Sequence, residues 1–390
     1  MNGENAEDGG WGANQAGCLL LDSVELLECR WTARRQPELF FKGGAFTDLR
    51  FTPVSKANTG GIHTNFYEMG WLIIHQIKEI YYPLLATFGV PANLVAIVII
   101  SRGNCGLSKC ISVYMMAMAT ADLLLLIFHV IVVQIFSFRF PCSFLSDTAV
   151  CKFIAHICNF TLHTSVWLTV SFTFDRFVAI CCRKFETNYC TLRTAAVVIT
   201  AVTAFFCFKN IPFYFVIEPE RIINNVSWDC RSRVEFFSSP AGVAFSCLES
   251  ILVPWLPLAL ILLCNCLTVR RILAASRARR RLRRLNSDNR SDPEVENRRK
   301  SIILLFAVSG SFIHLWLPVS VSYLTTRLAS TTRYDGENTA PGYIATESGY
   351  LFMYLSSSVN TCIYAATQTK FRKELTALVK SPWIFIKKCV

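Results

Sequence analysis

Long apolar segments alternate with short polar segments along most of the chain. Seven of the apolar segments are long enough to cross a bilayer, which takes about 20 residues in a helix. They run over about 71–101, 110–138, 147–182, 194–216, 241–273, 299–327 and 341–367. This pattern predicts an all-α membrane protein in which residues 69–367 form a seven-transmembrane helix bundle.

The N-terminal segment, residues 1–68, lacks this pattern. It is Gly-rich and polar without a sustained period, which predicts a mostly disordered tail. The apolar stretch from Cys18 to Leu27 is short, is interrupted by acidic residues and has no basic region before it, so it is a poor signal peptide. We therefore expect the first span to act as its own signal anchor.

Composition agrees with a membrane protein. The chain is 53% hydrophobic and 17% charged, whereas about a quarter of the residues in a soluble domain are charged. The net charge of +12 is concentrated between Arg270 and Lys300, where twelve basic residues accompany four acidic ones. This run has no aromatic residues to stack on bases, so it predicts a cytoplasmic loop near anionic lipid rather than a nucleic-acid site.

Basic residues also predict the orientation of the bundle. They follow the first, third, fifth and seventh apolar segments, whereas the other loops mix acidic and basic residues. The positive-inside rule then places the N-terminus outside the cell, as expected for a multi-pass protein of the plasma membrane. The sequon Asn225-Val226-Ser227 falls on the outer side, which makes Asn225 a candidate glycosylation site.

Several polar residues lie inside the apolar segments, where they are costly and usually functional. Five of them are expected to converge at mid-depth: Asn93, Asp122, Ser165, Ser356 and Asn360. A carboxylate with amide and hydroxyl neighbours suits a small hard cation such as sodium. The alternative is a protonated Asp122 that is hydrogen-bonded to Asn93 and Asn360, and the residues alone leave both interpretations open.

Two further features have both a structural and a functional interpretation. Asp175-Arg176 stands at the inner end of the third segment, where Arg176 either extends to lipid headgroups or forms a switchable ion pair. Pro318 follows Trp316 in the sixth segment and predicts a kink, which is either static packing or a place where the helix swings.

In order along the chain, these residues form a series of motifs. They are Gly89-Val90-Pro91-Ala92-Asn93, Ala119-Thr120-Ala121-Asp122, Asp175-Arg176-Phe177, Phe312 with Trp316-Leu317-Pro318, and Asn360-Thr361-Cys362-Ile363-Tyr364. In this order, the chain resembles the rhodopsin-like, or class A, G-protein-coupled receptors from about Trp71 to Leu378. The resemblance implies a receptor that passes an extracellular signal to a heterotrimeric G protein, with arrestin as a further partner.

The resemblance also implies roles for single residues. Arg176 would hold the receptor off and then engage the G protein, Tyr364 would stabilise the active arrangement, and Trp316 would couple the ligand to Pro318. Cys151 would pair with Cys230 in the second outer loop. Residues 368–390 would form a short amphipathic helix on the inner leaflet and a short cytoplasmic tail.

Departures from the family pattern concern the resting state. The chain carries Phe177 in place of the Tyr of the Asp-Arg-Tyr motif and Thr361 in place of the Pro of the Asn-Pro-x-x-Tyr motif. In the fifth apolar segment, Asn265 stands where a Tyr is expected. Arg298 stands near the place of the acidic residue that often pairs with the inner Arg. We therefore expect a weak inactive-state lock and measurable basal signalling.

Within this class, strings such as Lys209-Asn210-Ile211-Pro212 look similar to a small orphan subfamily, expressed mainly in brain and implicated in sensing tryptophan and phenylalanine. Helical spacing predicts a ligand pocket lined by Cys158, Asn159, Leu162, His163, Glu249, Trp316, Val319, Ser320, Tyr323, Glu347, Tyr350 and Tyr354. Cys158 stands where amine receptors carry Asp, which makes a monoamine ligand a poor fit. Tyr354 stands where opsins carry the retinal-binding Lys, so the chain does not resemble an opsin there. Glu249 is a candidate partner for a ligand ammonium.

Other functions fit the sequence less well. A peptide ligand is the main competitor to a small molecule, and we expect Gq-type coupling by the subfamily resemblance. A seven-helix transporter would show internal repeats, and an intramembrane enzyme would show a catalytic motif; the sequence shows neither. We expect no enzymatic activity, and no cofactor apart from an allosteric sodium ion.

Overall fold

The structure is a computed structural model that describes residues 63–103, 107–137, 139–140, 143–182, 189–223, 226–233, 235–236, 239–283, 293–330 and 340–389. Its helices are α2 (His63–Ser101), α3 (Lys109–Leu125), η2 (Leu126–Ser137), η3 (Phe144–Ser146), α4 (Thr148–Cys181), α6 (Leu192–Lys209), α7 (Ile211–Val216), α9 (Pro240–Ser250), η4 (Ile251–Trp255), α10 (Leu256–Arg283), α11 (Pro293–Ser330), α12 (Ala340–Thr367) and α13 (Thr369–Cys389). Helix α2 begins at His63, before the expected boundary at residue 68.

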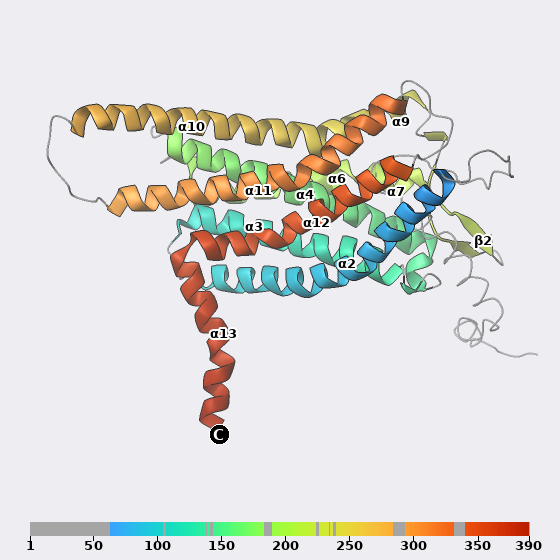
Figure 1. Cartoon of the computed structure of the whole chain (residues 1–390), viewed down its shortest axis with the longest axis horizontal. Coiled ribbons are helices and arrows are strands. Elements are labelled where there is room, and N and C mark those ends of the chain that lie inside the picture. Colours follow the sequence, from blue (N-terminus) through green and yellow to red (C-terminus); the bar gives the residue numbers. More distant parts are fainter. Residues whose placement is uncertain are drawn as a thin grey trace, which may run out of the picture.

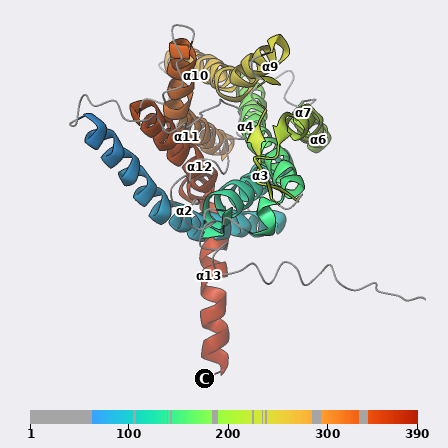
Figure 2. The same ribbon diagram turned by 90° about the vertical axis from the view of Figure 1, so that its right-hand side faces the viewer.

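The long helices run side by side as a bundle, and α13 leaves the bundle at a steep angle (Figure 1). Seen from the end, the helices form a ring, with α12 and α3 between α2 and the rest (Figure 2). Five helical segments in the described residues are long and apolar enough to cross a membrane. The third and seventh spans, α4 and α12, carry more polar side chains, including those of the central motifs. The predicted all-α seven-helix membrane fold is confirmed.

Prolines and changes of helix type shape three of the spans. The second span changes from α-helix to π-helix at Leu126, and the fifth contains a π-helical turn with Pro254. The fourth span ends its main helix at Lys209, and Asn210 and Pro212 begin the short helix α7. Pro318 lies inside α11, which continues through it as one helix. The break at Lys209 turns a cationic side chain toward the inside of the bundle.

Two apolar clusters fill the interior. The inner cluster contains Tyr114, Phe172 and Tyr364, and the outer cluster contains Trp316 and Tyr354. Helices α11 and α12 approach closely at Gly349, where a Cβ atom would lie 2.7 Å from the Cα atom of Val319. Small residues at such crossings let membrane helices pack backbone to backbone.

The outer polar segment between the fourth and fifth spans folds into short strands that the sequence did not predict. Strand β1 (Ile217–Glu218) pairs with β4 (Arg231–Ser232), and β2 (Arg221–Ile223) pairs with β3 (Val226–Trp228), both antiparallel. Trp228 also forms an isolated antiparallel bridge with Asp147, just before α4. These pairings hold the loop against the outer end of α4.

Candidate functional site

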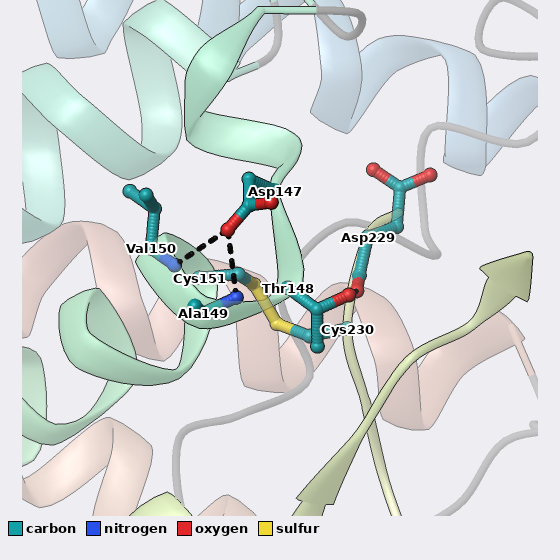
Figure 3. The surroundings of a disulfide bond; sticks show 7 residues. All are labelled: Asp147, Thr148, Ala149, Val150, Cys151, Asp229 and Cys230. Carbon is teal, nitrogen blue, oxygen red and sulfur yellow. Dashed lines mark hydrogen bonds between the residues drawn. A yellow bond between two sulfur atoms is a disulfide. The ribbon is translucent and has the colours of Figure 1, made fainter. Parts of the chain in front are cut away.

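A disulfide between Cys151 and Cys230 joins the outer end of α4 to the strand loop (Figure 3). Asp147 caps α4 by accepting from the backbone N–H groups of Ala149 and Val150. Thr148 donates to the backbone oxygen of Asp229, beside the disulfide. The predicted pairing is present, and it fixes the loop to the end of the bundle where α4 begins. Asn225, the candidate glycosylation site, lies outside the described residues.

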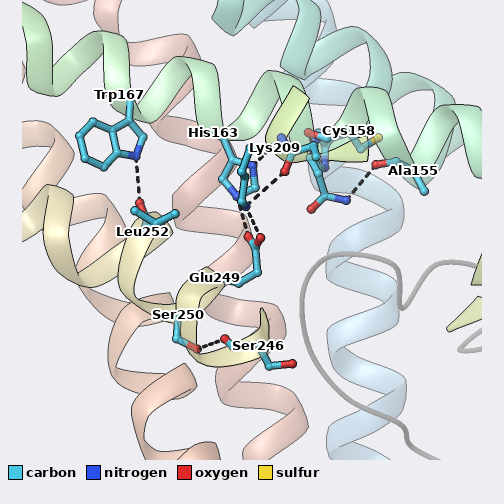
Figure 4. A network of polar contacts seen from close by, with 12 residues as sticks. Ala155, Cys158, His163, Trp167, Lys209, Ser246, Glu249, Ser250 and Leu252 are labelled. Atoms are coloured by element: carbon cyan, nitrogen blue, oxygen red, sulfur yellow. Dashed lines mark hydrogen bonds and ion pairs between the residues drawn. The ribbon is translucent and has the colours of Figure 1, made fainter. Parts of the chain in front are cut away.

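A ring of four polar side chains joins the third, fourth and fifth spans (Figure 4). Lys209 forms an ion pair with Glu249 and donates to Asn210 Oδ1 at 3.3 Å. The Nδ2 atom of Asn210 lies 2.9 Å from His163 Nδ1, and His163 Nε2 lies 3.1 Å from Glu249 Oε2. All four side chains are at least nine-tenths buried.

The ring defines one consistent protonation pattern. Since an amide nitrogen only donates, Asn210 Nδ2 requires an accepting Nδ1 on His163. The other imidazole nitrogen then carries the proton and points at the Glu249 carboxylate. Glu249, the predicted partner of a ligand ammonium, therefore already contacts Lys209 and His163.

Aromatic side chains surround this ring. The imidazole of His163 stacks on Phe206, with ring centroids 5.4 Å apart. The Nζ atom of Lys209 lies 5.8 Å from the ring centres of both Phe213 and Phe245. Such contacts stabilise a buried cation, because the ring faces carry partial negative charge.

A second aromatic group, the tyrosine wall, consists of Tyr323 from the sixth span and Tyr350 and Tyr354 from the seventh. Tyr323 donates to the hydroxyl of Tyr350 at 2.8 Å, and Tyr350 stacks on Tyr354. His129 Nε2 lies 2.8 Å from the backbone oxygen of Cys158 and must donate to it, so His129 Nδ1 accepts from the hydroxyl of Tyr354 at 3.2 Å. Tyr354 of the seventh span is thereby tied to the second span through His129, and His129 in turn to the third span at Cys158.

The remaining predicted pocket residues do not form one group in the structure. Leu162, Trp316, Val319, Tyr323, Tyr350 and Tyr354 share the outer apolar cluster. Cys158 packs in a smaller cluster with Val133, and Asn159 donates to the backbone of its own helix. Ser320 likewise bonds its own helix, at Trp316. The Glu347 side chain pairs with Lys78 at 2.8 Å, which ties the first span to the seventh.

The polar centre forms largely as predicted. Ser165 donates to Asp122 Oδ1 at 2.6 Å, and Asn360 donates to Asp122 Oδ2 at 2.8 Å. Asn93 instead donates to the backbone oxygens of Gly89 and Ser357, so it does not contact the carboxylate directly. The hydrogen bond between Asn93 and Asp122 that the neutral alternative required is therefore absent.

A small cavity opens at this polar centre. It is lined by Asp122, Ser165, Thr169, Val308, Ser311, Phe312, Trp316, Ser356 and Asn360. The indole N–H of Trp316 donates to Ser356 at 3.2 Å, and its ring stacks on Phe312. Trp316 and Asp122 thus line one cavity, and each bonds a side chain of the seventh span there, Ser356 and Asn360 respectively.

At the inner end of the third span, Arg176 pairs with the preceding residue, Asp175, and its Nε atom donates to Asp175 Oδ2 at 3.0 Å. The thiol of Cys110 donates to the other oxygen, Oδ1, at 3.3 Å. The Cys190 thiol contacts the backbone oxygen of Asp175. Burial and the nearby Asp175 raise the pKa of Tyr189, which keeps its hydroxyl neutral.

Tyr364, a predicted switch residue, and the positions that depart from the family pattern have their own contacts. Tyr364 packs edge-on against Phe371 of α13 and is fully buried. Asn265, at the place of the expected Tyr, donates to Ser309 at 2.8 Å and so ties α10 to α11. Thr361 donates to the backbone oxygen of Ala92. The side chain of Arg298 lies outside the described part of the chain.

The comparison with known families agrees with this arrangement. The family model of the 7 transmembrane receptor (rhodopsin family) matches residues 92–364, well over half of the 390 residues. The chain therefore belongs to the rhodopsin family of seven-transmembrane receptors. It is a multi-pass membrane protein of a signalling class, and not a typical enzyme.

Sequence reasoning missed part of the site. Lys209, Asn210 and His129 all lie inside predicted spans, but none was expected in the pocket. A signal was available for Lys209, because a cation inside a membrane span is by default a functional residue. The pairing of Lys209 with Glu249 could not be predicted from the sequence, because it depends on where helix α6 ends.

Proposed function

We propose that this receptor transmits an extracellular small-molecule signal to a heterotrimeric G protein. The observation that carries the proposal is the continuous column of contacts through the bundle. It runs from the tyrosine wall to Trp316 and across the cavity to Asp122 and Asn360. Tyr364, one helical turn beyond Asn360 in the same span, is fully buried. Among the described residues, the ion-pair partner of Arg176 is its own neighbour Asp175, so the contact can open without a change in helix packing.

The proposed ligand is an aromatic amino acid. Support comes from the likeness of the sequence to the amino-acid-sensing orphan subfamily and from the aromatic side chains around the outer core. Stacking on the tyrosine wall and on Phe206, Phe213 or Phe245 suits an aromatic side chain. The coupling we favour is to the Gq type, with arrestin as a further partner.

A peptide ligand is the second candidate, and the hairpin of β2 and β3 favours it. Ile222 is exposed on this hairpin, and a hairpin edge can add an extended peptide as a further strand. An ordinary small-molecule pocket would not need such an edge. A panel of short peptides tested beside free amino acids separates the two ligands.

The proposed topology places the N-terminus outside the plasma membrane and α13 on the inner leaflet. Positive-inside charge and the disulfide support it, since disulfides persist in oxidising compartments. The same orientation makes Asn225 available for glycosylation and sets the basic stretch near lipid headgroups. Antibody access to an N-terminal tag on intact cells tests this topology.

A sodium ion at the polar centre is a further proposal. The cavity presents hard oxygen donors from Asp122, Ser165 and Ser356, and a carboxylate with two bonds has lone pairs left for a cation. These residues fit the ion, which would add positive charge beside Asp122. We expect sodium chloride, but not the chloride of a bulky organic cation, to weaken agonist potency, and Asp122→Asn to remove this difference. Equal salt effects in wild type would contradict the site.

The experiment that tests the main proposal is G-protein activation in cells expressing the full chain. L-tryptophan and L-phenylalanine should produce a calcium response that is absent from mock cells. Arg176→Ala should reduce that response by at least about tenfold, as loss of a charge-assisted contact of 1.5–3 kcal/mol predicts. Arg102→Ala, an exposed arginine at the end of α2, is the matched control. Full signalling by Arg176→Ala at normal surface expression would contradict the proposal.

A further inference from the structure

The geometry points to Lys209 and Glu249 as an exchangeable ion pair that admits a zwitterionic ligand. The ligand's carboxylate takes the place of Glu249 at Lys209, and its ammonium takes the place of Lys209 at Glu249. This inference rests on the proposed small-molecule function and names the charged part of its binding site. It adds Lys209, in the fourth span, as a residue that determines ligand specificity.

The first observation is that the pair retains other partners when it opens. Glu249 keeps His163 Nε2 at 3.1 Å, and Lys209 keeps Asn210 Oδ1 at 3.3 Å. Each charge therefore loses one partner of two, and the ligand supplies the replacement. A pair without these side contacts would leave both groups unsolvated during exchange.

The second observation is that the two charges are buried inside membrane spans. Buried ion pairs contribute little to stability compared with apolar residues of the same shape. Charges inside membrane spans instead mark binding sites and relays. Here the two charges come from different spans, α6 and α9, and lie among Phe206, Phe213 and Phe245.

The third observation concerns which ligands fit. The two side-chain charges are in direct contact, so the replacing charges must lie only a few bonds apart in the ligand. An α-amino acid meets this condition. A ligand with one charge would pair one residue and leave the other buried without an opposite charge, which is strongly unfavourable. The pair therefore selects zwitterions over simple amines and simple acids.

Exchange also has a consequence for signalling. The ring joins α9 to α4 and α6 through side chains alone. Replacing the Lys209–Glu249 contact with two ligand contacts moves the fifth span relative to the fourth. Ligand binding is thereby coupled to the outer end of a span whose inner half, α10, contacts α11 through Asn265.

The test uses the full receptor and four probes in a G-protein dissociation assay. The first probe, L-phenylalanine, carries both charges. Its amide and phenethylamine lack the carboxylate, and N-acetyl-L-phenylalanine lacks the ammonium group. In wild type we expect L-phenylalanine to be about 30-fold more potent than each of the others, the effect of one unpaired buried group.

The variants then separate the two charges. Lys209→Gln should abolish the preference for acid over amide, and Glu249→Gln the preference for free over acetylated amine. The reversed pair, Lys209→Glu with Glu249→Lys, should regain zwitterion preference and decides the question if a single variant does not reach the surface. Lys152→Gln is the matched control. The Nζ atom of Lys152 also lies 5.8 Å from the centre of an aromatic side chain, that of Tyr214, but Lys152 does not belong to the network of Lys209, Asn210, His163 and Glu249.

The outcomes distinguish the inference from the function it rests on. A wild-type receptor that responds to none of the probes contradicts the amino-acid ligand and the exchange together. A receptor that responds to L-phenylalanine, but whose variants lose potency equally for all probes, contradicts the exchange alone and leaves the ring as a structural tie. Equal wild-type potency of the amide and the free acid also overturns the exchange.

Discussion

Two buried ion pairs of the described core, one near each end of the bundle, are built differently. At the inner end, Asp175 and Arg176 are neighbours in one helix, so their contact joins no two spans. In the outer half, Lys209 and Glu249 belong to different spans, and His163 from a third span joins them. The inner pair can therefore rearrange without moving a helix, whereas the outer pair cannot.

The two ion pairs also differ in the side chains that support them. Besides Arg176, Asp175 contacts two thiols, that of Cys110 from α3 at its carboxylate and that of Cys190 at its backbone oxygen, and a thiol is a weak donor. The outer ring has four hydrogen-bonded members, two of them charged. The outer pair is thus held by more side chains than the inner pair. The weak inner lock and the basal signalling remain predictions.

The largest effect should come from breaking the outer pair on one side. Glu249→Leu leaves Lys209 buried without an opposite charge, which costs about 3–5 kcal/mol. For a domain of this size, the melting temperature should fall by about 6 °C or more. The double variant Lys209→Met with Glu249→Leu should recover most of the loss, because an apolar pair replaces an ion pair.

Thermal unfolding in detergent, followed with a dye that reacts with newly exposed thiols such as that of Cys158, measures this difference. Lys78→Met is the control, because the Lys78–Glu347 pair is partly exposed and should matter less. A double variant as unstable as Glu249→Leu would show that the outer ring does not depend on charge pairing.

The fold was largely predictable because its main signal is local. Seven apolar segments and the placement of Arg and Lys follow directly from the order of residues. The strands between residues 217 and 232 were not predictable, since each has only two or three residues and depends on pairing across the loop. The change to π-helix at Leu126 likewise has no residue that announces it.

The site was predictable where it follows motif order and not where it depends on helix ends. Asp122, Ser165 and Asn360 meet as expected, because each lies at mid-depth of its span. Asn93 was expected in the same group but bonds the backbone of the seventh span. The break at Lys209 and Asn210 sets the outer ring, and helical periodicity continues past such a break without marking it.

An intermediate effect should come from the inner pair. Asp175→Asn removes the charge that holds Arg176, and a hydrogen bond to a charged group contributes about 1.5–3 kcal/mol. If that contact belongs to the resting state, basal G-protein activation should rise by about tenfold or more. Asp147→Asn, at the outer cap of the same helix, is the matched control. Unchanged basal activity at equal surface expression would mean that the inner pair restrains nothing.

The smallest effect should come from the thiol that supports Asp175. Cys110→Ala removes the donor to Oδ1 and leaves Arg176 as the remaining side-chain donor to this carboxylate among the hydrogen bonds described. Because a thiol is a weak donor, basal activity should rise only about twofold, the effect of a few tenths of a kcal/mol. Cys110→Ser supplies a stronger donor of similar size and should lower basal activity or leave it unchanged. A rise of the same size in both variants would assign the effect to packing in the inner cluster, where Cys110 is also buried, and would remove the thiol from the comparison between the two ends.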